Sequence, residues 1–199
     1  MLTAFAALAV IAPPASAAPV VGQPAPNFKL NDADGRVVTL SDFKGKPVVL
    51  EWNNPGCPFV QKHYGSGNMQ KTQAAAKAAG AVWLSINSGG PGEQGHMNGA
   101  EAKAFVASAK AQPAAYLLDP KGVVGKGYDA KTTPHMYVID AKGTLVYAGG
   151  IDDKPTADPA DINGARNHVL AALSELKAGK AVSVATSRPY GCNVKYAKG

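Results

Sequence analysis

The chain has 199 residues and a formal net charge of +6. This length is typical of one domain with a complete hydrophobic core. The lysines are scattered singly and form no basic block interleaved with aromatic residues, as Lys29, Lys62, Lys103 and Lys142 illustrate. A nucleic-acid-binding face would cluster them, so nucleic acid is not an expected partner.

The first 17 residues contain no charged side chain and carry an apolar run, 4–12. Pro13-Pro14 and the small-x-small triplet Ala15-Ser16-Ala17 follow it. We expect a secretory signal cut after Ala17, which places the mature protein in the periplasm or outside the cell. The alternative is a disordered alanine-rich tail. The run is too short to span a bilayer and no later segment approaches that length, so no membrane span is expected in the mature form.

The mature chain begins with a proline-containing coil, 18–26. Alternating apolar residues around Gly35 then predict a β-hairpin over 27–40. A short capped turn, 41–45, leads into Val48-Val49-Leu50, whose branching suits a buried strand. That strand ends at Trp52 and is followed by turn residues, 53–56.

The second half predicts alternating helices and strands. The helix after the turn is interrupted at 65–67, resumes at Asn68 and ends at Gly80. The remaining expectations are a strand over 81–87, a surface loop over 88–98, a helix over 99–111, strands over 115–118, 136–139 and 144–148, and a helix over 163–180. Two antiparallel strands after a parallel unit indicate a mixed sheet.

Cys57 falls where the central strand gives way to a helix. Pro58 suits the first helical position, where its missing N–H costs nothing. Free N–H groups and the positive end of the helix dipole favour a thiolate at this place. The sequence therefore predicts a reactive cysteine; the alternative is a small core residue that precedes a helix.

The order strand, Trp52, turn, Cys57, Pro58, helix resembles the redox-active segment of thioredoxin-fold proteins. The stretches VGQPAPNFKL, CPFVQKHY and GCNVKY resemble the peroxiredoxin-like branch of the redoxins, the alkyl hydroperoxide reductase and thiol-specific antioxidant group. The resemblance implies an α/β, thioredoxin-like fold. Its central mixed sheet would be flanked by helices and carry an N-terminal β-hairpin and a C-terminal helical extension from about residue 150. A single domain over 18–199 is expected.

The resemblance also implies a set of site residues. Cys57 would be the nucleophile, and Pro134 would follow a cis peptide bond so that the backbone of Thr133 meets an incoming peptide or thiol. Trp52 and Pro58 complete the predicted substrate-binding set, although the size of Trp52 also suits a packing platform.

Two positions depart from the family patterns. Val60 stands where thioredoxins have a second cysteine, and Asn54 stands where peroxiredoxins have a threonine. Neither Arg166 nor Arg188 can be assigned as a peroxidase arginine. Thiol–disulfide exchange is therefore expected to be measurable and peroxide turnover slow.

Cys192 is the only other cysteine, 135 positions after Cys57. It resolves a disulfide formed at Cys57, forms a permanent bridge with it, or is a separate structural thiol. A pair would require the extension to return across the active edge, because the two Cα atoms must lie within about 7 Å.

The sequence thus predicts an exported thiol oxidoreductase with catalytic Cys57 and Cys192 and no cofactor. Its partners would be protein thiols, disulfides or a peroxide, and a thiol electron donor. Two alternatives remain: a copper- or metal-binding module, for which the two cysteines, His63 and His135 are the soft ligands, and a non-catalytic interaction module. Lys62 and His63 are expected to be solvated or packing residues rather than bases.

Overall fold

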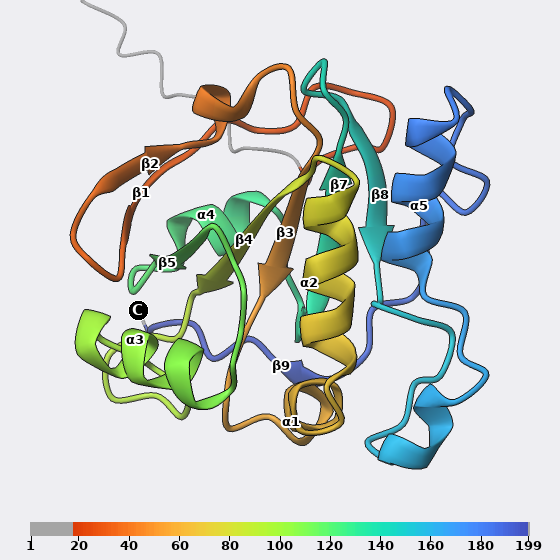
Figure 1. The fold of residues 1–199 in the computed structure, drawn as a ribbon. Helices are drawn as coiled ribbons and strands as arrows, with labels where there is room; N and C mark the ends of the chain where they lie inside the picture. Colours follow the sequence, from red (N-terminus) through yellow and green to blue (C-terminus); the bar gives the residue numbers. More distant parts are fainter. Residues whose placement is uncertain (1–17, 199) are drawn as a thin grey trace, which may run out of the picture.

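The computed structural model describes residues 18–198 (Figure 1). The predicted signal segment lies outside the described residues. A seven-stranded sheet has the order β2-β1-β5-β4-β3-β7-β8, and β6 and β9 form a separate pair. The strands are β1 (Lys29–Asp32), β2 (Val37–Thr39), β3 (Val48–Trp52), β4 (Val82–Asn87), β5 (Ala115–Leu118), β6 (Thr132–Thr133), β7 (His135–Ile139), β8 (Leu145–Gly149) and β9 (Cys192–Asn193).

The large sheet is mixed, as predicted. Strands β3, β4 and β5 are parallel, whereas β7 is antiparallel to β3 and β8 is antiparallel to β7. The N-terminal hairpin β1–β2 adds to the edge of β5. The carboxyl ends of the three parallel strands therefore meet the start of β7 at one edge of the sheet, where ligands typically bind in α/β proteins.

Helices cover both faces of the sheet (Figure 1). They are α1 (Pro58–Gly65), α2 (Asn68–Ala78), α3 (Gly99–Ser108), α4 (Val123–Gly127) and α5 (His168–Lys177), with 3-10 turns η1 (Leu40–Phe43) and η2 (Pro159–Ile162). Helices α1, α2 and α5 contribute to one apolar cluster, and α4 contributes with the N-terminal hairpin region to another.

Strand β3 is buried on both faces because it lies between these two clusters. Val49 belongs to the cluster of α1, α2 and α5, whereas Val48, Leu50 and Trp52 belong to the opposite cluster. Side chains alternate along a strand, so Glu51 shares the face of Val49. Full burial of each apolar side chain contributes about 1.5–3 kcal/mol, so β3 is firmly held in the sheet, as is β7, which is equally buried.

The observed helices differ from expectation in two places. Helix α5 begins at His168, not at 163, because the Asn167 side chain caps it by accepting the N–H of Leu170 at 3.0 Å. Helix α4 was not predicted, since its sequence VVGKG holds two glycines in five residues and shows no helical periodicity. The interruption between α1 and α2 is confirmed: Gly67 adopts φ +76°, which glycine tolerates without strain.

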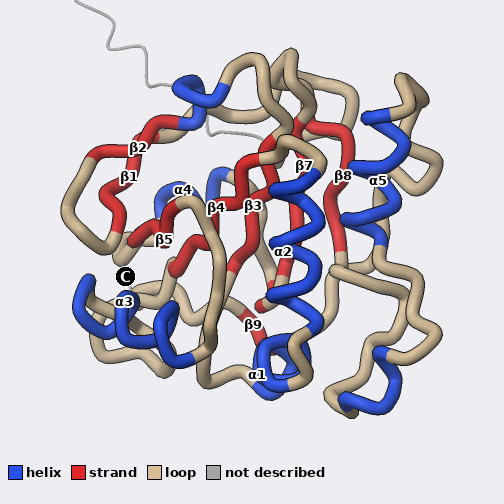
Figure 2. The backbone as a smooth tube through the Cα atoms, in the orientation of Figure 1, coloured by secondary structure: helices blue, strands red, loops and turns tan. Residues whose placement is uncertain are grey.

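The C-terminal extension does not end with α5. It runs back along the sheet edge and forms β9 beside β6, close to α1 (Figure 2). Within the described range, no helix is long and apolar enough to cross a membrane.

Candidate active site

Cys57 lies at the helix junction that the sequence predicts. It is the N-cap of α1 with an extended backbone, φ −83° and ψ 125°, and Pro58 occupies the first helical position. The turn before it is closed by the Cys57 N–H, which donates to the carbonyl of Asn54 at 3.0 Å. The sulfur therefore sits at the N-terminus of α1, where unpaired N–H groups and the helix dipole favour negative charge.

The loop before β7 meets the Cys57 thiol. Trp52 at the end of β3 pairs with His135 at the start of β7, which places Thr133 and Pro134 opposite the junction. The Cys57 thiol donates to the Thr133 carbonyl at 3.0 Å, and the Thr133–Pro134 peptide bond is cis, as the family resemblance implied. Thr133 and Pro134 are both buried beside the sulfur.

The tail brings Cys192 to the same point. In the register of β6 and β9, Thr133 lies opposite Cys192 and Thr132 lies opposite Asn193. The Cys192 N–H points at the Cys57 sulfur at 3.4 Å, and the Thr133 hydroxyl donates to the Cys192 carbonyl at 3.4 Å. Both cysteines are free thiols. The structure thus brings together the two predicted catalytic residues.

Gly191 makes this close approach possible. Its φ is +136°, and a Cβ atom built there would lie 2.1 Å from the Thr133 carbonyl oxygen. Any other residue would push the tail away from β6 and so separate the two sulfurs. The sequence signal was the Gly-Cys pair after Pro189. This pair indicated a turn but not that the tail would pair with Thr132 and Thr133.

The two thiols differ in acidity. Burial opposes ionisation of Cys57, but hydrogen bonds from the Cys192 thiol and from the N–H groups of Val60 and Cys192 more than offset it. The pKa of Cys57 therefore lies below that of an ordinary cysteine. Burial raises the pKa of Cys192 to about 11, and the hydrogen bond to Cys57 and its negative charge act in the same direction. Of the pair, Cys57 is the one that ionises first.

A buried polar network anchors the tail just before Cys192. The Tyr190 hydroxyl donates to Asp152 and lies 3.2 Å from Nε2 of His63, whose Nδ1 contacts the Asn68 amide at 2.8 Å. Burial lowers the pKa of His63 to about 4, Lys62 adds to this effect and Asp152 opposes it. His63 is accordingly neutral near pH 7.

Lys62 reinforces the same network. Its ammonium group donates to the Lys154 carbonyl at 2.9 Å and lies 5.8 Å from the centre of the Tyr190 ring, a cation–π contact. Lys62 and His63 are only 2% and 0% exposed, so the expectation that they are solvated is wrong, whereas the alternative of packing is right. Helical spacing alone could not show this, because the segment that covers them comes from the far end of the chain.

Glu51 is a fully buried carboxylate that sequence reasoning missed. It accepts hydrogen bonds from Tyr64, Trp83 and Ser85 at 2.8–3.0 Å, and from Asn53 at 2.8 Å. Burial raises its pKa and these hydrogen bonds oppose the rise. Because Tyr64 belongs to α1, the carboxylate ties the helix that carries Cys57 to the central strand. A charged residue within an apolar run was the signal that could have revealed it.

Asn54, at the position where peroxiredoxins have threonine, makes structural hydrogen bonds. Its amide donates to the Gln94 side chain at 2.9 Å, and its oxygen accepts the Gly56 N–H at 2.9 Å. These bonds hold loop 88–98 against the turn before Cys57. Among the described residues, no arginine donates a hydrogen bond to Cys57.

Two predicted substrate-binding residues lie in different surroundings. Pro58 is exposed next to Cys57. Trp52 is 0% exposed, packs against Tyr128 and Tyr137, and donates its indole N–H to Ser88 at 3.0 Å. The expectation that Trp52 contacts substrate is therefore wrong: strand alternation turns it into the core on the opposite face from α1.

The histidines considered as metal ligands have other partners. His63 contacts Tyr190, and His135 contacts the Tyr137 hydroxyl at 3.1 Å. In the range 18–198 there is no group of three or more His, Cys, Asp or Glu side chains placed to hold a metal ion.

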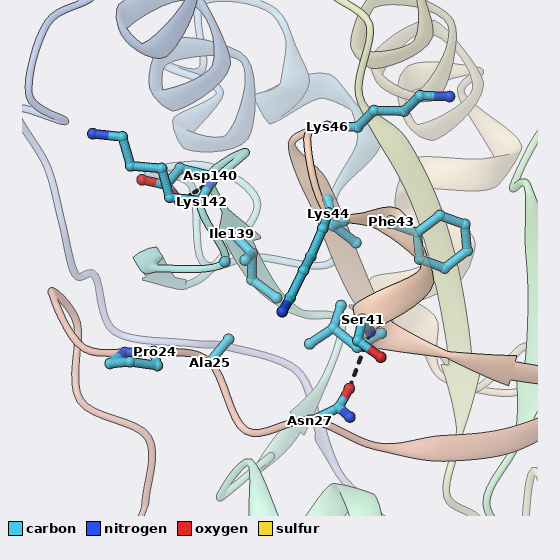
Figure 3. Close-up of a pocket in the computed structure, with 13 residues that line it drawn as sticks. Pro24, Ala25, Asn27, Ser41, Phe43, Lys44, Lys46, Ile139, Asp140 and Lys142 are labelled. Atoms are coloured by element: carbon cyan, nitrogen blue, oxygen red, sulfur yellow. Dashed lines mark hydrogen bonds between the residues drawn. The ribbon is translucent and has the colours of Figure 1, made fainter.

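A separate hollow lies at the opposite end of the sheet, between the start of β3 and the end of β7 (Figure 3). Its volume is about 270 Å³. Lys44 extends into it beside Ile139 and Ser41, while Lys46 points away. Neither Cys57 nor Cys192 lines it.

Comparison with solved structures identifies the fold as thioredoxin-like. A Sinorhizobium meliloti 1021 protein named as hypothetical superposes with a TM-score of 0.73 at 26% identity, covering 92% of this chain and 98% of that one. The thioredoxin domain of a Bacteroides vulgatus thiol-disulfide oxidoreductase has a TM-score of 0.53 at 23% identity, covering 65% and 87%. A protein assigned as the thiol:disulfide interchange protein DsbE of Chlorobium tepidum has 0.54 at 27% identity, covering 66% and 85%.

The chain belongs to the AhpC/TSA family, which it matches over residues 21–148. Peroxiredoxin Q of Oryza sativa subsp. japonica is 55% identical over 40 residues, which cover 18% of each chain. Peroxiredoxin Q of Triticum aestivum is 32% identical over 137 residues, covering 63% of this chain and 57% of that protein. The matched segments thus span little more than half of these relatives at most. The predicted family and fold are both confirmed.

Proposed function

We propose that this protein is a thiol–disulfide oxidoreductase in which Cys57 and Cys192 cycle between a dithiol and an internal disulfide. The observation that carries the proposal is the 3.4 Å approach of the Cys192 N–H to the Cys57 sulfur. The β6–β9 pair holds Cys192 opposite Thr133, whose carbonyl lies 3.0 Å from the same sulfur. Family membership and the similarity to an interchange protein support redox chemistry of this kind.

The roles of the two cysteines follow from their acidities. Cys57 supplies the stabilised thiolate, and Cys192 is the thiol that completes the internal disulfide. In thioredoxins the second thiol comes instead from a cysteine at the place that Val60 occupies in this chain. Thr133 and Pro134 hold the loop that faces both sulfurs. Peroxide is a poorer substrate than a disulfide, because Asn54 has no hydroxyl where peroxiredoxins have a threonine. The Asn54 amide group is in addition occupied by its hydrogen bond to Gln94.

Two parallel assays test the proposal. The reduced protein is mixed with glutathione disulfide or with hydrogen peroxide, and free thiols are counted with time. We expect glutathione disulfide to remove both thiols of the wild type, with Cys57 and Cys192 linked in the peptide map, and peroxide to act slowly. Matched Cys57→Ser and Cys192→Ser variants should form no internal bridge. Fast peroxide consumption that Cys57→Ser abolishes would show a peroxidase instead.

We further propose that the protein works in the periplasm or outside the cell, where disulfides persist. The apolar run and Ala15-Ser16-Ala17 support export. N-terminal sequencing of protein from the periplasmic or secreted fraction should begin at Ala18, and an intact Met1 form confined to the cytoplasm would contradict this.

A further inference from the structure

Two neighbouring buried side chains each hold a polar atom without a hydrogen-bond partner among the described residues. The atoms are Oδ2 of Asp152 and Nδ1 of His168. The two residues lie on adjacent segments, because the His168 N–H donates to the Ile151 carbonyl at 2.9 Å. Asp152 is only 4% exposed and His168 only 9%. Buried polar groups in folded proteins almost always have partners, so this pair requires an explanation.

The Asp152 carboxylate uses one of its two oxygens. Oδ1 accepts the Tyr190 hydroxyl, and it accepts the Lys154 N–H at 2.9 Å. Both donors are neutral. Within residues 18–198, no lysine or arginine forms an ion pair with Asp152. The ammonium group of Lys62 donates to the Lys154 carbonyl instead. A buried carboxylate without a counter-ion favours a cation at its free oxygen.

The imidazole of His168 offers a second acceptor. Burial lowers its pKa, and Arg166 adds to this effect while Asp153 and Asp152 oppose it. The ring is therefore neutral near pH 7, and a neutral imidazole accepts a hydrogen bond at one of its nitrogens. A donor group placed between Asp152 and His168 would satisfy both residues at once.

Both residues line one cavity of about 580 Å³, which is bounded by α1, the start of α5 and the tail. Phe59 and Tyr190 add aromatic rings to the lining, with their centres 5.9 Å apart in an edge-to-face arrangement. The exposed Asp153 is a second carboxylate of this lining. The volume suits a small molecule or a single side chain of a partner.

We propose that this cavity binds an organic ammonium group that donates hydrogen bonds to Oδ2 of Asp152 and Nδ1 of His168. A primary ammonium carries one positive charge and three N–H donors, so it matches a free carboxylate oxygen and a neutral imidazole. The rings of Phe59 and Tyr190 suit both the carbon chain and the cation. Two sources carry this group: a small free amine and a lysine side chain of a partner protein.

Other occupants match the lining less well. An anion would meet the Asp152 charge. A metal ion lacks ligands, because the part of the chain that the structure describes has no third His, Cys, Asp or Glu placed to complete a set. The proposal is independent of the dithiol cycle, since neither Cys57 nor Cys192 lines the cavity. Binding is therefore measured on fully reduced protein.

The first test compares three probes with chains of four carbons. Uniformly nitrogen-15-labelled wild-type protein is titrated at pH 7 with n-butylamine, n-butanol or butyrate, and the backbone amide resonances are followed by NMR. We expect n-butylamine to shift Asp153, His168 and Tyr190 in a saturable way, with a dissociation constant of about 1–10 mM. The alcohol and the anion should bind at least about tenfold more weakly. Equal or tighter binding of n-butanol or butyrate would overturn the proposal.

Matched variants then locate the charge. Asp152→Asn keeps the shape of the side chain but removes its charge, whereas Asp153→Asn makes the same change at an exposed residue of the lining. We expect the first variant to raise the dissociation constant of n-butylamine by about tenfold or more, and the second by less than about threefold. His168→Phe keeps a ring and removes the acceptor, so it should weaken binding even if Asp152→Asn does not fold. Unchanged binding in His168→Phe, or an equal loss in the two asparagine variants, would contradict the assigned contacts.

The last arm distinguishes the two sources of the ammonium group. The peptide acetyl-Gly-Lys-Gly-amide is titrated beside its norleucine counterpart, which has the same carbon chain without the amine. Binding of the lysine peptide at least as tight as that of n-butylamine, with none for norleucine, would point to a lysine of a partner protein. Binding of n-butylamine alone would point to a small free amine. No saturable binding of either amine would overturn the proposal and leave only solvent as the partner of Asp152 and His168.

Discussion

Cys57 and Cys192 meet at one point but are held there by different kinds of structure. Cys57 follows the central strand β3, which is buried on both faces, and caps a helix that Glu51 ties to the sheet through Tyr64. Cys192 belongs to a two-residue strand in a tail that has little regular structure of its own. Its position depends on single contacts spaced along the chain, at Tyr190, Gly191 and Tyr196.

The difference separates two tasks of a dithiol site. The strand–helix junction sets the acidity of one thiol, because the peptide dipoles and N–H groups of α1 are fixed by the core. The tail sets how close the second thiol lies, because its anchors can be changed one at a time without disturbing β3. Changes at the junction should therefore act on stability first, and changes in the tail on the link between the sulfurs.

The largest expected effect is at the junction. Glu51→Ala leaves the hydroxyl or N–H donors of Tyr64, Trp83 and Ser85 without their acceptor, and should lower the free energy of unfolding by about 3–5 kcal/mol. Glu51→Gln keeps one acceptor oxygen and should cost less. Urea denaturation measures both. A loss below about 1 kcal/mol in Glu51→Ala would show that α1 is not held through this carboxylate.

Acid should destabilise the fold through two buried histidines, one in α1 and one at the start of β7. Burial lowers the pKa values of His63 and His135 to about 4, below an unfolded value near 6.5. The unfolded chain binds more protons than the folded chain between these values, so stability falls as the pH drops from about 6.5 to 4. Each histidine contributes about 3 kcal/mol to that fall.

His135→Gln separates the two contributions, because it keeps a polar side chain but removes the titration. Urea unfolding from pH 7 to 4 should show a shallower loss of stability in this variant than in the wild type. Identical pH profiles would mean that His135 takes up a proton as readily in the folded chain as in the unfolded one.

A smaller effect compares the two anchors of the tail. Tyr190→Phe removes the hydroxyl that bonds to Asp152 and contacts His63, whereas Tyr196→Phe removes one bond to the Ala130 carbonyl. We expect a loss of about 1–2 kcal/mol for Tyr190→Phe and less for Tyr196→Phe. Only Tyr190→Phe should also leave a buried carboxylate short of a donor. An equal loss of stability in the two variants would show that the Tyr190 network holds the tail no more strongly than the single Tyr196 hydrogen bond does.

The smallest expected effect concerns thiol acidity. Serine at 192 can still donate a hydrogen bond to Cys57, but alanine cannot. The pKa of Cys57, followed by thiolate ultraviolet absorbance, should therefore be higher in Cys192→Ala than in Cys192→Ser, since the hydrogen bond from Cys192 lowers it. The same pKa in both variants would show that the tail N–H groups and the helix dipole lower the pKa of Cys57 without the hydrogen bond from the side chain at position 192.

The comparison also explains what the sequence could reveal. The junction was predictable because its signals are local: a branched apolar run, turn residues, Cys57 and Pro58 follow one another within a few positions. The family resemblance supplied the fold and the facing loop at Pro134. The burial of Trp52 also follows from strand alternation once its opposite face is known to be covered.

The tail was not predictable in the same way. Its partners, Asp152, His63 and Thr133, lie far from it in sequence, and nothing local shows that Lys62 is covered by Tyr190. The two-residue strands β6 and β9 are too short to leave an alternating pattern. The sequence offered a Gly-Cys turn and two cysteines that lie 135 positions apart. Only the three-dimensional structure shows that these two cysteines lie next to each other.

The most direct test of the central claim is the redox equilibrium of the two thiols. Wild-type protein is equilibrated in buffers with graded ratios of glutathione to glutathione disulfide, trapped by acid, and its linked peptides and free thiols are counted by mass. We predict one transition in which both thiols disappear together and a Cys57–Cys192 bridge appears. Two thiols that stay free, or that accept glutathione independently with no bridge between them, would contradict the account.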